Sequence, residues 1–451
     1  MSENQSTITE PGRETPLWGS YEVVVLGGGP AGIAAAAAAG RSGRSTLLVE
    51  RHGYLGGNGT AAGVSNFGGL HANVHGDHRV VVHGVGADLL NRIEALDGLK
   101  PAHLSLQGKI MSQAFDISAY KIAAEQIMAD AGVEMIYLAF GAGVVMRTET
   151  MIQALLVETK SGRFAIEGKV FIDCSGDGDL AAWAGAPFEM GDGKGTMMYP
   201  TTMFRINSAD ASRAVNDIAA TNQLVKESID GGRKLPRNGV IVLPQKNGLE
   251  WRVNATQVAN PDGSPVDGTD ARQLTHGQIE GHRQVLQVFE FIKETMPGFE
   301  DSYIVDIAPQ LGIRETRLIQ GEYRLTEEDV LGCADFEDTI GVSGWPVERH
   351  VAGDVLIKFP PIPKSRGFTQ LPYRMIVPKK VENLLVAGRC ASMTHQGQSA
   401  VRVTGPCLVM GEAAGTAADL VLAGNTTPRQ IDVPQLQDRL TVGGAYLGTE
   451  I

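Results

Sequence analysis

The pattern of apolar and polar positions near the N-terminus predicts a β–α–β unit. An apolar run at residues 23–26 is followed by small, helix-forming residues at 33–39 and by a second apolar run at 46–49. Short apolar runs without alternation are typical of strands that are buried on both faces, as in parallel sheets. We therefore predict an α/β protein that begins with two parallel strands joined by a tightly packed helix.

The same periodicities predict further elements along the chain. Helices are expected over residues 86–96, 118–131 and 274–295 and after the capping-box sequence at 326–329, and strands over residues 133–138, 143–148 and 152–159. In the long helix at 274–295, Ile279, Leu286, Phe289 and Ile292 are predicted to lie on one side.

Three glycines between the first strand and the first helix carry the strongest motif. Gly27, Gly29 and Gly32 have G-x-G-x-x-G spacing. The first glycine allows a tight turn, the second lets the backbone approach a pyrophosphate, and the third permits close helix–strand packing. The phosphates would sit at the helix N-terminus. Glu50, which ends the second strand, can accept hydrogen bonds from a ribose.

Two other interpretations of this stretch are weaker. Residues 21–39 have the length of a membrane span, but three consecutive glycines and a proline would break such a helix. A glycine-rich turn without a ligand would not require the complete order of strand, turn, helix, strand and terminal acid. We therefore interpret the stretch as a dinucleotide site.

Composition narrows the class of protein. The 451 residues, 43% of them hydrophobic, suffice for two or three domains. A net charge of −12 disfavours nucleic acid or an anionic membrane as a partner. The four cysteines are far apart and the histidines between residues 71 and 83 are irregularly spaced, so we predict no metal site. Residues 1–19 are polar and lack a signal-peptide core, so we expect a mobile leader and a cytoplasmic protein.

Four blocks of sequence resemble one family. They are ERHGYLGG at residues 50–57, KVFIDCSGDGD at 169–179, IRETR at 313–317 and VENLLVAGRC at 381–390. These blocks resemble the FAD-dependent oxidoreductases with the glutathione-reductase type of FAD fold. The resemblance implies an α/β fold with a Rossmann-like FAD-binding domain, discontinuous at residues 20–199 and 371–451. It also implies an inserted α+β substrate or cap domain at residues 200–370.

The resemblance implies FAD as the cofactor. It assigns cofactor contacts to Gly27, Gly29, Pro30, Ala31, Gly32, Glu50, Arg51, Gly56, Gly57, Asn58, Ala142, Gly388 and Val401. A helix over residues 401–422 would point its N-terminus at the flavin. Some relatives carry a reactive disulfide after the Gly-Gly pair, where this chain has Asn58 and Gly59, so a disulfide reductase is disfavoured.

Three residues are candidates for the chemistry of the substrate. His395, expected in the loop before the helix at 401–422, is either a packing histidine or a group that exchanges a proton over the flavin. Arg402 either holds a substrate carboxylate or pairs with an acid. Arg314 either forms a structural ion pair with Glu315 or binds substrate.

The leading functional hypothesis is an enzyme that moves a hydride between a small organic substrate and FAD. Residues 200–370 contain no second nucleotide motif, so electrons would pass to or from oxygen, a quinone or another acceptor. A flavin-dependent monooxygenase and a non-redox FAD-binding protein are the alternatives. A small molecule is the expected partner, with no nucleic acid or membrane, and a homo-oligomer is left open.

Overall fold

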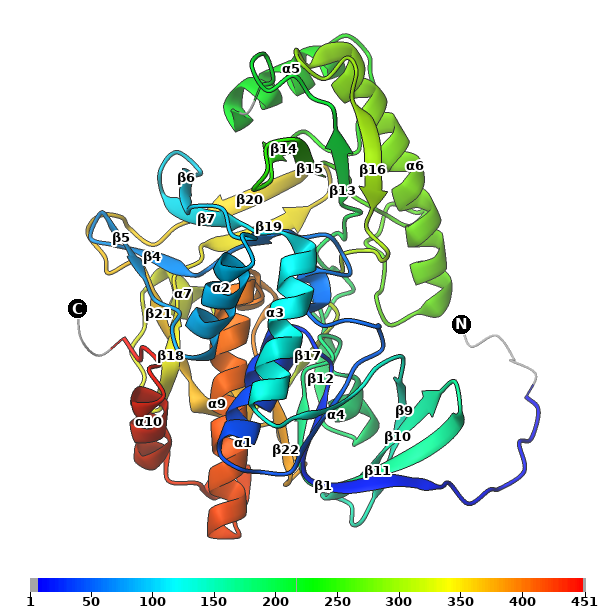
Figure 1. Cartoon of the computed structure of the whole chain (residues 1–451), viewed down its shortest axis with the longest axis vertical. Coiled ribbons are helices and arrows are strands. Elements are labelled where there is room, and N and C mark those ends of the chain that lie inside the picture. The colour runs from blue at the N-terminus through cyan, green and yellow to red at the C-terminus, as the bar shows by residue number, and fades with distance from the viewer. Residues whose placement is uncertain (1–6, 216, 449–451) are drawn as a thin grey trace.

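The centre of the fold is a sheet whose middle strands run parallel (Figure 1). Within residues 7–215 and 217–448, which the computed structural model describes, this sheet has seven strands. The parallel strands lie in the order β8-β2-β1-β11-β22, and the antiparallel strands β10 and β9 extend the sheet from the first half of β11. Their bounds are β1 Leu17–Leu26, β2 Thr46–Val49, β8 Glu134–Ile136, β9 Phe140–Met146, β10 Ile152–Thr159, β11 Gly162–Asp173 and β22 Leu384–Val386. The prediction of a mixed α/β fold built on parallel strands is confirmed.

Two helices pack against each other beside this sheet. α1 (Pro30–Arg41) follows β1, and α9 (Thr404–Gly424) lies along α1 (Figure 1). A Cβ atom added at Gly411 would lie 2.1 Å from the carbonyl oxygen of Ala31. An added Cβ at Gly415 would lie 2.1 Å from that of Ala35. The two backbones therefore approach more closely than any larger residue at these positions would permit.

The helix predicted over residues 401–422 is present as α9, and a separate short helix precedes it. α8 (His395–Val401) ends before Arg402 and Val403, and α9 begins at Thr404. A proline cannot donate the backbone hydrogen bond that a continuous helix needs, but it fits the first turn of a new one. Pro406 therefore separates the two helices, and His395 begins a helix instead of lying in a loop.

α9 is the one helix in the described part of the chain that is long and apolar enough to cross a membrane. However, 72% of its most apolar 18-residue stretch is buried inside the fold. Its apolar character is explained by its central position between α1, the sheet and β18 (Thr339–Ser343).

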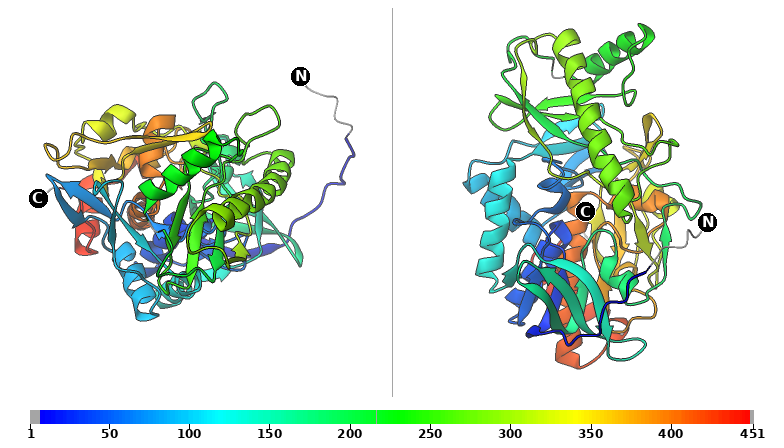
Figure 2. Two further views of the ribbon diagram at one scale, coloured as in Figure 1. Left: turned by 90° about the horizontal axis from the view of Figure 1, so that it is seen from above. Right: turned by 90° about the vertical axis from the view of Figure 1, so that its right-hand side faces the viewer.

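A second unit stands above the sheet in Figure 1 and has a core of its own. In the described residues its sheet has four antiparallel strands in the order β14-β15-β13-β16. The elements are β13 Phe204–Asn207, α5 Ile218–Asp230, β14 Ile241–Pro244, β15 Glu250–Asn254, α6 Ala271–Thr295 and β16 Tyr303–Ile307. Figure 2 shows the long helix α6 running along this unit and down towards the main body. Its core is built around large side chains such as Trp251, Phe291 and Phe299.

The apolar side predicted for α6 is buried only in part. Ile292 is buried, but Ile279 and Leu286 are 67% and 56% exposed. The buried side is instead built in part from small residues, because a Cβ atom at Gly281 would lie 2.0 Å from the Thr202 hydroxyl oxygen. Glycine carries no hydrophobic signal, so the apolar periodicity alone does not reveal which side of α6 faces the core.

The chain after β16 returns to the main body, and its apolar residues from Leu325 to Val377 pack in the same core as α1 and α9. The elements there are β17 Arg317–Ile319, α7 Glu327–Leu331, β18, β19 Val347–Val351, β20 Asp354–Lys358 and β21 Thr369–Pro372. The remaining elements are β3 Asn66–Phe67, β4 His71–Val74, β5 Asp77–Val80, α2 Val85–Ala95, β6 His103–Ser105, β7 Ile110–Ala114, α3 Ile117–Asp130, α4 Asp179–Trp183, β12 Phe188–Met190 and α10 Val433–Val442. Short 3₁₀ turns lie at Gly57–Gly59, Tyr373–Ile376 and Pro428–Gln430.

The capping box expected at residues 326–329 is present, and α3 also begins with a side-chain cap. Asp116 accepts a hydrogen bond from the Ala119 N–H at 2.8 Å and so caps α3. Thr326 and Asp329 form a reciprocal capping box at α7. The first strand begins earlier than expected, because β1 pairs with β11 from Leu17, within the predicted leader. Residues 1–6 of that leader lie outside the described residues.

Candidate functional site

A cavity of about 570 Å³ lies between the carboxyl ends of the parallel strands and the second unit. Leu26 and Val49, the last residues of β1 and β2, and Cys174 and Ala387, just after β11 and β22, line it. Ligands of open α/β sheets bind at this edge, where the strands end. The opposite wall is made by α5, β14 and β15. Two regions of this cavity differ in chemistry, and we call them the nucleotide end and the arginine end.

The nucleotide end is formed by the turn between β1 and α1. A Cβ atom added at Gly29 would approach nothing nearer than the Gly57 Cα atom at 3.8 Å, so this backbone faces open space. An added Cβ at Gly32 would lie 1.7 Å from the Gly27 carbonyl oxygen, so Gly32 serves packing instead. α1 has no side-chain cap and no acidic residue in its first turn. Its N-terminus therefore remains available to an anion.

The loop after β2 covers this turn. The Gly56 N–H donates to the Gly28 carbonyl at 2.8 Å, and a Cβ atom at Gly57 would lie 2.9 Å from the Gly29 Cα atom. Asn58 donates its amide N–H to the Ile313 carbonyl at 2.9 Å. These contacts hold two glycine-rich segments against each other at one side of the cavity.

Glu50 is buried at the end of β2, with 6% of its surface exposed. Its two carboxylate oxygens accept the N–H of Gly28 at 2.6 Å and of His52 at 2.8 Å. An ionised carboxylate has about four acceptor sites. Glu50 lines the cavity and therefore keeps capacity for the hydroxyls of a ribose.

Most of the predicted cofactor residues line this cavity. Those that do are Gly27, Gly29, Pro30, Ala31, Glu50, Arg51, Gly57, Asn58 and Gly388, and those that do not are Gly32, Gly56, Ala142 and Val401. Ala142 is exposed, whereas its neighbour Gly141 lines the cavity, because successive strand residues face opposite sides. Val401 is fully buried, and the next residues, Arg402 and Val403, line the cavity in its place.

The turn after β11 is fixed by buried carboxylates. Asp173 accepts the N–H of Ser175 at 3.0 Å and the N–H of Ala181 at 2.8 Å. Burial would raise the pKa of Asp177, but the positive charges of Arg389 and Arg51 outweigh it and lower that pKa. Arg389 donates to Asp177 at 2.8 Å, so it is a cavity arginine with a carboxylate partner.

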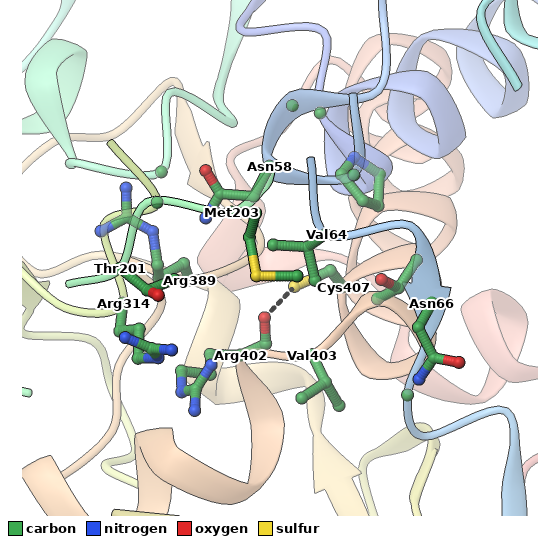
Figure 3. Close-up of a pocket in the computed structure, with 18 of the residues that line it drawn as sticks. Asn58, Val64, Asn66, Thr201, Met203, Arg314, Arg389, Arg402, Val403 and Cys407 are labelled. Carbon is green, nitrogen blue, oxygen red and sulfur yellow. Dashed lines mark hydrogen bonds between the residues drawn. The ribbon is translucent and has the colours of Figure 1, made fainter. Parts of the chain in front are cut away.

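Four further arginines form the arginine end, and they come from four separate segments. Arg237 precedes β14, Arg252 lies in β15, Arg314 precedes β17, and Arg402 follows α8. Figure 3 shows Arg314 and Arg402 projecting into the same part of the cavity. The side chains of Arg237, Arg252 and Arg314 are buried, and that of Arg402 is 12% exposed. All four line the cavity.

Glu348 and His350, both on β19, lie beside these arginines. Burial and the charge of Arg314 lower the pKa of His350 to about 3, so its imidazole is neutral at physiological pH. Burial would raise the pKa of Glu348, but its hydrogen bond with His350 and the charge of Arg402 lower it to about 2. Glu348 is therefore ionised, and its nearest oxygen lies 3.9 Å from Arg402.

His395 lies next to the cavity but is not among the residues that line it. Its Nδ1 atom is 2.8 and 2.9 Å from the two carboxylate oxygens of Glu315. Glu315 also accepts the Met198 N–H at 2.9 Å. The expected ion pair between Arg314 and Glu315 is absent among the described contacts, because Glu315 turns to His395 while Arg314 donates to the Tyr199 carbonyl.

Arg237, Arg252, Glu348 and His350 are site residues that the sequence analysis missed. They lie in a region without a recognised motif. The available signal was local, since Arg252 interrupts the apolar strand sequence Trp251–Val253 and E-R-H at residues 348–350 places two titratable groups on one side of a strand. In the described residues, no group of three or more His, Cys, Asp or Glu side chains could hold a metal ion.

The nucleotide end fits FAD. The open space beside Gly29 accommodates a pyrophosphate, the uncapped N-terminus of α1 favours its charge, and Glu50 is placed for the ribose. FAD would be held by these residues and by the loop at Gly57 and Asn58.

Comparison with known proteins gives one strong result. No curated protein matches the chain in sequence. Solved structures with a similar fold include a geranylgeranyl bacteriochlorophyll reductase-like protein from Thermoplasma acidophilum, 14% identical with a TM-score of 0.49, covering 95% of this chain and 84% of that one. The p-nitrophenol 4-monooxygenase PnpA from Pseudomonas putida DLL-E4 is 12% identical with a TM-score of 0.48, covering 96% and 90%. These likenesses are too distant to carry a functional argument.

The family model described as FAD dependent oxidoreductase matches residues 22–440, which include both ends of the cavity. The chain therefore belongs to the FAD dependent oxidoreductase family and is an oxidoreductase with FAD as its cofactor.

Proposed function

We propose that the enzyme transfers a hydride between a small organic substrate, bound at the arginine end, and FAD, bound at the nucleotide end. The observation that carries this proposal is that one continuous cavity is lined by both sets of residues. We further propose an FAD domain of the glutathione-reductase type at residues 20–199 and 371–451. The second unit, within residues 200–370, would then act as the cap over the substrate.

FAD supplies a two-electron acceptor or donor when it is bound. The protein supplies binding and orientation. Arg314 and Arg402 both line the cavity (Figure 3), and their guanidinium groups can bind and orient an anionic group of the substrate. The second unit covers this end, which excludes water and strengthens these electrostatic contacts.

We assign His395 a positioning role. Its imidazole holds Glu315, the residue next to Arg314, and Gln398 donates to the Arg314 carbonyl at 2.9 Å. α8 therefore fixes the backbone that carries Arg314. The alternative role, a proton-exchanging group over the flavin, stays a prediction that the same variants test.

Residues 200–370 contain no second strand–G-x-G-x-x-G–helix sequence, so we propose that electrons pass to oxygen, a quinone or another acceptor. The purified protein should absorb near about 370 and 450 nm, as flavins do. Anaerobic addition of candidate substrates should bleach the band near 450 nm, and oxygen should restore it in an oxidase. Incorporation of an oxygen atom into the product would instead establish a monooxygenase. The proposal would be overturned if no organic substrate reduced the bound FAD and if chemically reduced FAD passed its electrons to no acceptor.

A further inference from the structure

The arginine end carries more positive charge than its neighbours balance. Among the described residues, the ion pairs made by Arg237, Arg252, Arg314 and Arg402 amount to the single 3.9 Å contact of Arg402 with Glu348. The Nε atom of Arg402 is buried and has no hydrogen-bond partner in the described structure. Buried charges in proteins are normally paired. The protein therefore supplies no close anionic partner to these four arginines within the described residues.

Two other arginines show that the imbalance is local. Arg205 lies directly opposite Arg252 on the neighbouring strand and is paired with Glu250 at 3.0 Å and Asp306 at 3.1 Å. Arg389, which also lines the cavity, is paired with Asp177. Neighbouring arginines thus have carboxylate partners, whereas the four arginines of the arginine end have no carboxylate nearer than 3.9 Å among the described ion pairs.

Backbone carbonyls hold these guanidinium groups in place. Arg237 donates to the carbonyls of Gly239, at 2.6 Å, and Asn254. Arg314 donates to the Tyr199 carbonyl, and Arg252 donates to the Ser65 carbonyl at 3.4 Å. A carbonyl orients a guanidinium without neutralising it. The remaining N–H groups are free to form the paired hydrogen bonds that match a carboxylate.

The positive charge is concentrated in two places. The charges of Arg402 and Arg237 add to the effect of burial in lowering the pKa of Arg314, so these three form one cluster. The charge of Arg252 acts instead on Lys100 and His103, lowering the pKa of each after the larger effect of burial on both. Arginine keeps its proton in proteins, so these shifts express an unfavourable energy that a bound anion would relieve.

We propose that the substrate is an organic acid with at least two carboxylate groups, one bound by Arg237, Arg314 and Arg402 and the other by Arg252. This inference rests on the proposed function and names its substrate class. The phosphates of FAD are not the missing anions in this proposal, because the nucleotide end offers them the N-terminus of α1.

The experiment compares matched acids on the purified, FAD-loaded protein. Dicarboxylates from malonate to adipate are titrated beside the monocarboxylates from propionate to hexanoate and beside inorganic phosphate. Binding is read from the flavin absorption spectrum and from the unfolding temperature, neither of which requires turnover. At least one dicarboxylate should bind about 10-fold or more tightly than the monocarboxylate of equal length, as expected for one added charge-assisted contact.

Variants separate the two clusters. Arg252→Met should remove the advantage of the dicarboxylate and change monocarboxylate binding less than about twofold. Arg402→Met should weaken both by about 10- to 100-fold. The matched control is Arg205→Met, which removes the opposite, paired arginine and should leave the advantage intact.

Three results would overturn the proposal. One is that no dicarboxylate binds more tightly than its matched monocarboxylate, and another is that phosphate binds more tightly than every carboxylate. The third is that Arg252→Met or Arg402→Met loses FAD, measured as absorbance near 450 nm per protein, which would make these arginines part of the cofactor site. Failure of the proposed function looks different, because the dicarboxylate would then bind while no substrate reduces the flavin.

Discussion

The two ends of the cavity are built in opposite ways. The nucleotide end is made largely of backbone, and most of it comes from residues 26–59, one continuous stretch of sequence. The arginine end is made of long side chains from four segments between residues 237 and 402. The first end depends on the absence of side chains at Gly29 and Gly57, and the second on charges that the protein leaves without close partners. The comparison shows that one cavity can combine a site specified locally with a site that exists only after folding.

The strongest test of the nucleotide end is Gly29→Val. The new side chain has room in the protein but would occupy the space beside the turn, so FAD retention should be lost, with the absorbance near 450 nm falling at least 100-fold. The fold should persist, as measured by circular dichroism. The matched control is Gly53→Val, since a Cβ at Gly53 meets only Leu138 at 3.9 Å and Gly53 does not line the cavity. If Gly29→Val retained FAD, the cofactor would lie elsewhere.

The corresponding test of the arginine end is Arg314→Met. Loss of one charge-assisted contact should raise the dissociation constant of the substrate by about 10- to 100-fold, while FAD content stays at the parent value. Arg324→Met is the control, because Arg324 is paired with Glu189 outside the cavity. Equal loss of FAD and of substrate binding in Arg314→Met would remove the distinction between the two ends.

The pH dependence of stability sharpens the comparison further. The unfolded chain binds a proton at His350 below pH about 6.5, whereas the folded protein does so only near pH 3. Stability should therefore fall as the pH falls from 6.5 to 4.5, with a slope of up to about 1.4 kcal/mol per pH unit from this group. Glu348 adds little in the upper part of this window, because its carboxylate is almost fully ionised in both states above pH about 5.5, and it adds a loss of the same sign only as the pH approaches about 4.5.

Urea denaturation of His350→Gln across this pH range measures that contribution. In the variant, the free energy of unfolding should change less steeply with pH than in the parent, by up to about 1.4 kcal/mol per pH unit. His282→Gln, which alters an exposed histidine of α6, should keep the parent slope. An unchanged slope in His350→Gln would mean that the arginine end does not hold His350 neutral.

The smallest effect is expected at His395. In the positioning role, His395→Ala should raise the substrate constant about fivefold, as expected for about 1 kcal/mol of lost hydrogen bonding, and His395→Gln should restore part of it. Flavin reduction at saturating substrate should stay within about twofold of the parent in stopped-flow measurements. A loss of 10²–10⁴ in that rate, with a changed pH profile, would instead identify a proton-exchanging residue.

The sequence was sufficient to predict the features that depend only on residues close together along the chain. The glycine motif and Glu50 lie within one β–α–β unit, and the capping box at Thr326 acts within a few residues. The structure places these elements where the sequence predicts them. Ala142 does not line the cavity whereas its neighbour Gly141 does, because strand alternation decides which residue faces it and the exact register was not known from the sequence.

Long-range packing was not accessible in the same way. The buried face of α6 depends on Gly281 meeting Thr202, which no periodicity reveals. Arg314 and Glu315 are adjacent in sequence yet turn to different partners, since the carboxylate meets α8 and the guanidinium meets the cavity. Arg252 shows the same limit, because it lines the cavity only through the place that β15 takes in the folded chain.

The contact between α1 and α9 has a consequence for where substitutions disturb the enzyme most. Ala31, on α1, and Thr404, on α9, both line the cavity, and Gly411 and Gly415 lock the two helices together farther along. Any larger residue at either glycine would displace one helix from the other and disturb both ends of the cavity at once. A substitution at either glycine should therefore disturb the cavity more than a substitution in the loops of the second unit, which do not take part in this helix contact.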